Sequence, residues 1–459
     1  MSARYPLPAA QHSIAARFLG DRGAVREATE RFGSPLHVVF PQVMAENAAA
    51  LEQVLSGHGV PHEVFYAHKV NASRALLAEA YAAGLGVDVA SSAELDRALA
   101  AGFAPDRIEA TGPKSPAFIE RIAALGVTAN ADDLWELDRL SDAVPDGSTV
   151  PVLLRLSGFA SPAVPPSRFG IDLADTGAAL EAVRRAPGLD LRGVAFHLDT
   201  ADPAARVDAL TEAMVVVAAA HRNGLRPSVI DIGGGFRQRF VDDPVPFQRY
   251  AQALATPGDL VWPGHDVAAP AAHKYGNHHP ATDVLERFLT AEIERRPVAE
   301  VLRECLLTLW IEPGKALVDH AGVTLASVLY RKRAAGRDLV VLDLSRNQIA
   351  PADQEVLVDP ILVDPALVDP ALVDGRRERP GDGFFLAGRL CLESDLISRR
   401  KVFLDSEPVS GDVLAFVNTA AYQMDLSASA AAGHPPPPKV AAVLDGDRFI
   451  FTADDDHGS

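Results

Sequence analysis

From Glu63 onward, short runs rich in Val, Ile and Leu alternate along the chain with longer segments of helical periodicity. A strand followed by a helix, repeated in this way, is typical of a parallel sheet. The short runs predict strands at 63–69, 86–90, 107–111, 126–130, 150–156, 192–198, 228–232 and 307–312. The longer segments predict helices at 73–83, 91–102, 115–125, 132–142, 175–186, 203–223 and 281–304. Eight strands in about 250 residues favour an α/β fold with a closed (β/α)8 TIM-type barrel over an open doubly wound sheet.

The rhythm changes after residue 315, where strand-like runs such as DLVVLDLS and DVLAFVNTA alternate with Gly, Asp and Pro turns. This pattern predicts a mostly β C-terminal domain over 316–459, beside a barrel domain over 41–315. The N-terminal segment, 1–40, ends in the strand-like run PLHVVF, and we expect this segment to join the β domain.

Two segments have unusual composition. Residues 357–374 repeat a five-residue unit, LVDP followed by Ile or Ala, and its regular prolines forbid a helix or a central strand. We therefore expect a surface loop without chemistry there. Residues 262–280 contain four histidines, whose spacing matches no metal-binding pattern, so we expect a solvated or lid-forming loop and no metal site. These histidines are His265, His273, His278 and His279.

The charge balance narrows the classes of partner. The chain has 43 Lys and Arg against 61 Asp and Glu, a formal net charge of −18, with no basic run. Such a surface repels nucleic acid and anionic membranes. No apolar stretch is long enough to cross a bilayer, and the only two cysteines, Cys305 and Cys391, cannot form a disulfide framework. We expect a cytoplasmic protein with a small-molecule substrate.

Chemically distinctive residues lie at the ends of four predicted strands. Lys69 closes the first, His197 the sixth and Glu312 the eighth, while Gly233, Gly234 and Gly235 follow the seventh. Taken alone, the lysine is usually a solvated cation, the histidine a hydrogen-bonded structural residue and the glycines a turn. In a barrel, however, all strand ends meet at one rim, which is where active sites are built. We therefore expect these residues to share one site.

Their combined chemistry points to pyridoxal phosphate. Glycines let backbone N–H groups approach a phosphate closely. A lysine can hold a carbonyl cofactor as a Schiff base. A carboxylate can keep a pyridine nitrogen protonated, and an imidazole can stack on the ring.

The chain resembles the fold-type III pyridoxal-phosphate decarboxylases, the diaminopimelate and ornithine decarboxylase group. The resemblance runs from about residue 35 to residue 440. It is carried, in order, by YAHKVN (66–71), GVDVASSAEL (86–95), SRFGI (167–171), DIGGGF (231–236), EPGK (312–315), CLESD (391–395) and AAY (420–422).

This resemblance implies roles for particular residues. Lys69 is implied to bind the cofactor covalently, His197 to stack on its ring and Glu312 to pair with its pyridine nitrogen. Cys391 and Asp395 are implied to enter the active site from the second subunit of a head-to-tail homodimer, with Cys391 catalytic. The remaining implied residues are Asp88 near the ring, Thr200, Gly233, Gly234, Gly235, Lys315 and Tyr422 at the phosphate, and Arg155 at the substrate.

Departures from the family pattern concern the phosphate and the substrate. Asp199 and Thr200 stand where relatives have Gly-Ser, and Lys315 replaces an arginine, so we expect a looser grip on the phosphate. Leu392 replaces an acid that reads a distal ammonium group in relatives with basic substrates. An apolar side chain cannot compensate a buried cation. Ornithine, lysine and diaminopimelate are therefore expected to be poor substrates, unless Glu393 takes over the role.

The predicted function is decarboxylation of an amino acid or an amino-acid derivative. A carboxylate, Glu312, beside the pyridine nitrogen favours this reaction, because racemases on this barrel tend to place a cation there. The alternatives are a racemase or epimerase on the same scaffold, and a non-catalytic homologue that binds the cofactor.

Overall fold

The computed structural model describes residues 4–457, except 22, 201, 268–274, 351–354, 364–382 and 428. Eight parallel strands within this part of the chain close into a barrel, because β5 pairs with β6. The predicted (β/α)8 barrel is therefore confirmed. Its strands are β2 (His62–Ala67), β3 (Gly86–Val89), β4 (Ile108–Ala110), β5 (Thr128–Ala131), β6 (Val150–Ser157), β8 (Leu189–Ala195), β9 (Val229–Asp231) and β12 (Thr308–Ile311).

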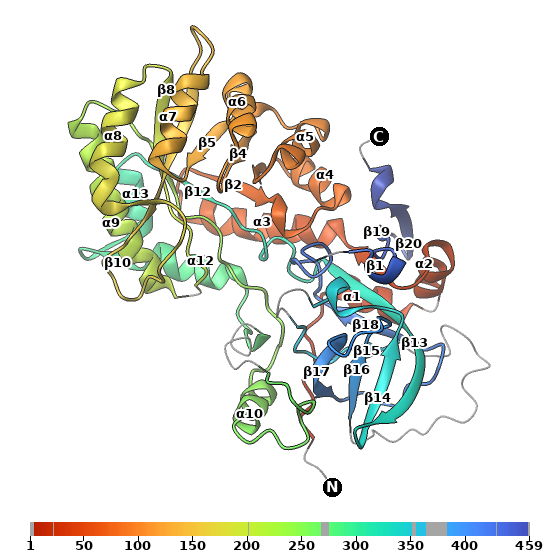
Figure 1. Ribbon diagram of the computed structural model, residues 1–459. Coiled ribbons are helices and arrows are strands. Elements are labelled where there is room, and N and C mark those ends of the chain that lie inside the picture. Colours follow the sequence, from red (N-terminus) through yellow and green to blue (C-terminus); the bar gives the residue numbers. More distant parts are fainter. Residues whose placement is uncertain are drawn as a thin grey trace.

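Helices surround the barrel (Figure 1). Several begin directly at a strand end, where a Ser or Asp side chain accepts a hydrogen bond from the first helical turn, as Ser91 does from the Glu94 N–H. The order in the chain is α3 (Pro41–Gly57), α4 (Arg74–Ala82), α5 (Ser92–Ala100), α6 (Pro116–Leu125), α7 (Leu134–Ala143), α8 (Thr176–Arg185), α9 (Pro203–Arg222), α12 (Ala281–Thr290) and α13 (Val298–Glu304). Helix α10 (Val245–Ala253) lies apart from the barrel, and its Phe247 and Tyr250 join the core of the C-terminal sheet.

The single helix predicted over 281–304 is wrong. Helix α12 ends at Thr290, and a two-stranded hairpin separates it from α13. The hairpin consists of β10 (Glu292–Ile293) and β11 (Arg296–Pro297), and its two turn residues, 294 and 295, have positive φ. Pro297 lacks the N–H that a helix interior needs and its ring would clash with the preceding turn, so one helix cannot run through it, and α13 begins directly after it.

A second sheet forms the other half of the molecule, cyan to blue in Figure 1. Its longest strand pairs with β1, β14 and β18. Strand β1 (Leu36–Val39) runs antiparallel to β13 and parallel to β19, so the N-terminal strand lies between strands of the C-terminal half. The strands from the C-terminal half are β13 (Gly322–Ala334), β14 (Arg337–Leu342), β15 (Ile361–Leu362), β16 (Phe384–Ala387), β17 (Leu396–Val402), β18 (Val413–Val417), β19 (Lys439–Asp445) and β20 (Arg448–Ala453).

Two helices precede β1 and cover one end of this sheet: α1 (Ser13–Gly20) and α2 (Ala24–Phe32). Phe18 of α1 is fully buried and contacts the rings of Phe40, Phe449 and Phe451. This cluster ties the N-terminal segment to the last two strands. The domain limits 1–40, 41–315 and 316–459 remain a prediction.

The start of the LVDP repeat is not the surface loop that its prolines suggested. Leu357 and Val358 are buried in the hydrophobic core of the second sheet. Asp359 is also buried, and its carboxylate accepts hydrogen bonds from the guanidinium of buried Arg400 at 2.8 Å and from the Leu7 N–H at 2.7 Å. The first unit is therefore a structural anchor. Ile361 and Leu362 of the repeat form β15, and residues 364–374 lie outside the described residues.

The start of the histidine-rich segment lies against the second sheet, while His279 near its end is 3.5 Å from Asp283 of α12. Trp262 packs edge-on against Phe385 of β16, and its N–H donates to the Arg399 carbonyl. His273 lies outside the described residues.

Among the described residues, no helix combines the length and apolar character needed to cross a membrane.

Candidate active site

A polar layer crosses the inside of the barrel at the C-terminal ends of its strands. Beneath it lies a buried apolar cluster of Phe65, Leu153, Ala195, Val229 and Trp310. Because strand side chains alternate between two faces, the residue two positions later points to the same interior. Those later residues include Arg155, His197, Asp231 and Glu312. The alternation thus places the predicted site directly on top of the apolar core.

Lys69 lies in a single 3-10 turn, His68–Val70, immediately after β2. Its Nζ contacts Asp88 Oδ2 at 3.0 Å, and its side chain is 37 % exposed. It opens into a cavity of about 630 Å³ that His197, Arg155 and Tyr422 also line. Burial lowers the pKa of Lys69, but the carboxylates of Asp88 and Glu312 more than offset this and hold the pKa above its ordinary value. The resting amine is therefore protonated and paired with the Asp88 carboxylate.

His197 is held as a neutral imidazole. Its Nδ1 accepts a hydrogen bond from the Gly234 N–H at 3.1 Å, so the ring proton resides on Nε2. Burial, with the charges of Lys69 and Arg155, lowers its pKa to about 3. The ring is also close to the glycine loop, since a Cβ added at Gly233 would lie 2.9 Å from Nδ1.

The glycine loop follows β9 and can only be built from glycine. Gly233 and Gly235 have φ values of +65° and +76°. A Cβ at Gly235 would lie 1.8 Å from the Leu198 carbonyl oxygen, and one at Gly234 would lie 2.5 Å from the Glu312 carbonyl oxygen. The backbone therefore packs against two neighbouring loops, an arrangement that brings N–H groups close to a bound anion.

Three buried carboxyl groups meet on the floor of the site: Glu109, Asp231 and Glu312. One oxygen of each lies within 4.8 Å of the others. Burial raises the pKa of all three well above the ordinary value, and their mutual repulsion raises it further. The Asn130 amide donates to Glu109 at 2.8 Å. Three such groups cannot all ionise together, so the cluster holds protons at neutral pH.

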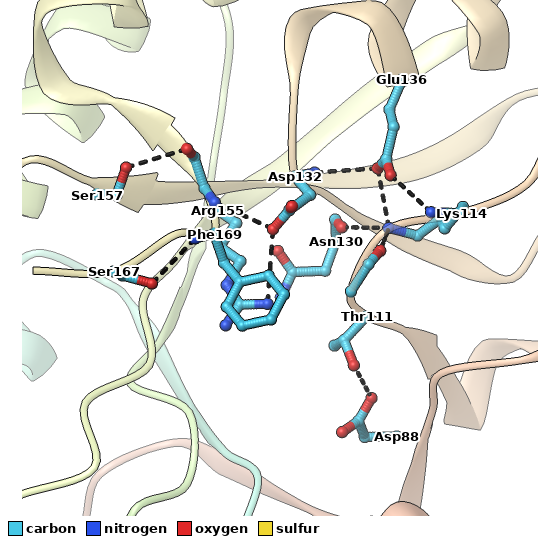
Figure 2. A network of polar contacts seen from close by, with 12 residues as sticks. Asp88, Thr111, Lys114, Asn130, Asp132, Glu136, Arg155, Ser157, Ser167 and Phe169 are labelled. Atoms are coloured by element: carbon cyan, nitrogen blue, oxygen red, sulfur yellow. Dashed lines mark hydrogen bonds and ion pairs between the residues drawn. The ribbon is translucent and has the colours of Figure 1, made fainter.

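One wall of the cavity is a hydrogen-bonded network (Figure 2). Lys114 is buried, and its ammonium donates to Glu136 at 3.0 Å and to the Asn130 carbonyl at 2.7 Å. Figure 2 shows Arg155 beside Asp132 and the ring of Phe169. Its guanidinium is 3.6 Å from Asp132 and 4.7 Å from the ring centroid, so Arg155 is fixed in the wall.

Two of the departures noted in the sequence contact each other. Lys315 Nζ lies 2.8 Å from Asp199 Oδ1. The expectation that each independently loosens the phosphate grip overlooked this ion pair, in which the two opposite charges largely cancel. Thr200 accepts a hydrogen bond from the Asp202 N–H. Tyr422 lines the cavity with a positive φ of 67° and donates its N–H to the Val70 carbonyl.

The motif from 391 to 395 does not reach the cavity of its own subunit. Cys391 is exposed and Leu392 is 61 % exposed, and neither lines the cavity around Lys69. Glu393 is exposed as well. Asp395 is buried, and its carboxylate accepts hydrogen bonds from the N–H groups of Arg346 at 2.6 Å and Leu390 at 2.8 Å. Asp395 thus shapes its own loop, and the entry of this motif into a neighbouring subunit's site remains a prediction.

Several residues of the site escaped the sequence analysis. Glu109 lies within the third predicted strand and Lys114 follows it; the alternation in RIEAT could have placed Glu109 inside the barrel. Arg206 is fully buried behind the glycine loop, yet it lies in an Ala/Val-rich helical run where an arginine reads as a solvated residue. Thr111 donates to Asp88 and so orients the partner of Lys69.

Comparisons with known proteins agree with this geometry. Residues 42–268 match the family described as pyridoxal-dependent decarboxylase, pyridoxal binding domain. An uncharacterized protein, y4yA, from Sinorhizobium fredii is 33% identical over 427 residues, which is 91% of this chain and 89% of that protein. The chain belongs to the fold-type III pyridoxal-dependent decarboxylases. A diaminopimelate decarboxylase from Halalkalibacterium halodurans is 27% identical, with 92% of this chain and 90% of the relative covered.

Solved structures share the decarboxylase fold. The diaminopimelate decarboxylase of M. jannaschii, in complex with L-lysine, superposes with a TM-score of 0.71 at 21% identity, covering 93% of this chain and 91% of that one. An arginine decarboxylase from Paramecium bursaria Chlorella virus, bound to agmatine, gives 0.66 at 20% identity, covering 92% and 98%.

The cofactor of this decarboxylase is pyridoxal 5'-phosphate, and the protein is a carboxy-lyase. The side chains and backbone of the site suit that cofactor. Lys69 and the neutral imidazole of His197 both line the cavity, and buried carboxyl groups lie on its floor. The glycine loop leaves a backbone cradle that a single added Cβ would fill.

Proposed function

We propose that this enzyme removes the α-carboxylate of an amino acid whose distal group is not a free ammonium. The observation that carries the proposal is the placement of Lys69. Its amine contacts Asp88 in a cavity that the neutral ring of His197 also lines. When bound, pyridoxal phosphate supplies an electron-accepting ring for the pair left by the departing carboxylate.

The residues of this chain have separate tasks. Asp88 holds and orients the ammonium of Lys69, which must lose its proton before the amine is nucleophilic. His197 offers a flat uncharged face and carries its proton on Nε2, away from the glycine loop. Glu312 is the proposed partner of the pyridine nitrogen. Its carboxyl neighbours hold protons, so Glu312 can be the member of the cluster that ionises when a cation approaches.

The cavity walls support the exclusion of a distal ammonium. Arg155 and Arg168 both line the cavity, and the lining carboxylate of Asp199 already pairs with Lys315. A distal ammonium would therefore face like charge, in addition to the apolar Leu392 proposed to come from a second subunit. That subunit would also bring Cys391, whose thiol is the proposed proton donor to Cα.

A panel of amino acids tests the proposal through release of carbon dioxide. We expect release from amino acids with neutral or acidic distal groups, and much less from ornithine, lysine or diaminopimelate. Lys69→Ala, as control, should release none. Preferential turnover of ornithine or lysine would contradict the proposed specificity.

Racemisation is the second candidate for this scaffold. The groups around Glu312 weigh against it, because its nearest described ionisable neighbours on the floor are carboxyl groups rather than a cation. Chiral chromatography of the same reactions separates the two activities. Interconversion of enantiomers without gas release would establish the racemase in place of the decarboxylase.

A further inference from the structure

Arg206 is a fully buried arginine that bridges two loops of the site. It lies in the first turn of α9, and its side chain points behind the glycine loop. Its Nη2 donates to the carbonyls of Gly234 at 2.7 Å, Leu198 at 3.1 Å and Thr200 at 3.1 Å. Its Nη1 donates to the Ile232 carbonyl at 3.2 Å. One guanidinium thus joins the loop after β8 to the loop after β9.

The charge of Arg206 has no hydrogen-bonded carboxylate among the described residues. Burial lowers its pKa to about 10, so the group remains a cation at neutral pH. Its guanidinium lies 4.6 Å from the ring centroid of Phe236. The charge of Asp199 raises the pKa of Arg206 and so partly offsets burial, but this carboxylate is in direct contact with Lys315. A buried cation is costly to keep, which suggests that the site needs its charge.

The carbonyls held by Arg206 also fix the direction of the N–H groups that share their peptide units. In a trans peptide, the C=O and the following N–H point in opposite directions. Holding the Gly234 carbonyl therefore turns the Gly235 N–H away from the guanidinium. The two loops are in close contact here, because a Cβ on Gly235 would lie 3.0 Å from Arg206 Nη2.

We propose that Arg206 builds the phosphate site of this enzyme, by locking the two loops together and by supplying the fixed positive charge behind them. Lys315 cannot supply that charge alone, since Asp199 neutralises it. Arg206 is a positioning residue: it acts on the phosphate through the backbone that it holds. This inference rests on the proposed function only in requiring that the protein binds pyridoxal phosphate.

The test compares the affinity for pyridoxal phosphate with that for pyridoxal, which lacks the phosphate. Both are measured by absorbance titration of the apoprotein. Arg206→Met removes the charge and the hydrogen bonds. We expect it to weaken the binding of pyridoxal phosphate by roughly 10- to 100-fold, the range for one lost charged hydrogen bond, and to change the binding of pyridoxal little. Arg222→Met, an exposed position on the same helix, is the control and should leave both affinities unchanged.

Urea unfolding of the apoproteins separates a purely structural role. If Arg206 only stabilises the fold, the ratio of the affinity for pyridoxal phosphate to the affinity for pyridoxal stays at the wild-type value. That result overturns the proposal. Should Arg206→Met fail to fold, Arg206→Lys keeps a charge but not the four contacts. It should still lower the ratio, and an unchanged ratio there would also refute the inference.

Lys315→Met tests the competing explanation, in which Lys315 supplies the positive charge for the phosphate. We expect it to change the ratio less than the Arg206 variants do, and the reverse order would overturn the assignment. Failure of the wild-type protein to bind pyridoxal phosphate at all would instead refute the proposed function.

Discussion

Substituting Gly235 by alanine tests whether the glycine loop needs its close packing. Any L-residue at its φ of +76° is strained by about 1 kcal/mol. The added Cβ would also lie 1.8 Å from the Leu198 carbonyl oxygen, so the loops after β8 and β9 must separate. Arg206 bonds to both sides, and the two bonds cannot both survive that separation.

The expected magnitude follows from those two contributions. Loss of one hydrogen bond to the charged guanidinium costs about 1.5–3 kcal/mol, which added to the backbone strain gives roughly 2.5–4 kcal/mol. Gly84 is the matched control, because its φ of +73° imposes the same strain while nothing lies within 4 Å of an added Cβ. Gly84→Ala should therefore lose only about 1 kcal/mol.

Urea unfolding of the apoproteins gives the stability change, and absorbance titration gives the cofactor affinity. Gly235→Ala should bind pyridoxal phosphate at least about 10-fold more weakly than wild type, since its phosphate-facing backbone is displaced. Gly84→Ala should bind normally. If the two variants show equal stability and equal affinity, the loop contact described here does not support the site.

Three further predictions use other parts of the molecule. His37 is buried with a pKa lowered to about 3, so the unfolded chain binds its proton below pH 6.5 and stability is lost as the pH falls. Relative to His37→Gln, the wild type should lose about 2 kcal/mol of unfolding free energy between pH 7 and pH 5, and a pH-independent difference would contradict this assignment. Lys114→Met leaves Glu136 buried without its cation and should cost about 3–5 kcal/mol in thermal unfolding, partly recovered by adding Glu136→Gln. An unchanged melting temperature would refute the importance of that pair. Inactive Lys69→Ala and Cys391→Ala subunits, mixed and reassociated, should regain about one quarter of the wild-type activity if each site combines both residues from two chains. No recovery would argue against shared sites.

Much of the barrel could be predicted from the sequence because its information is local. Each strand is a short apolar run, and an unusual polar residue such as Lys69 or Glu312 stands where the run ends. The family motifs then lie along the chain in order. The (β/α)8 class and the convergence of the strand ends needed no more than this alternation.

The parts that were missed depend on contacts between distant segments. Arg206 reads as a surface residue until the two loops that surround it are in place. The ion pair between Asp199 and Lys315 joins residues 116 positions apart. Asp359 reads as one unit of a loop repeat, and only the position of Arg400 makes it a buried anchor. Cys391 is exposed and away from the cavity of its own chain, so its proposed role in a second subunit's site stays a prediction.

The attachment point of the cofactor tests the central claim most directly. Reduction of the cofactor-loaded enzyme with borohydride, followed by proteolysis and mass spectrometry, fixes the Schiff base as a stable phosphopyridoxyl group on one lysine. The geometry of the cavity predicts the modification on Lys69, with none on Lys114 or Lys315. A phosphopyridoxyl group on another lysine, or none on any, would contradict the proposed site.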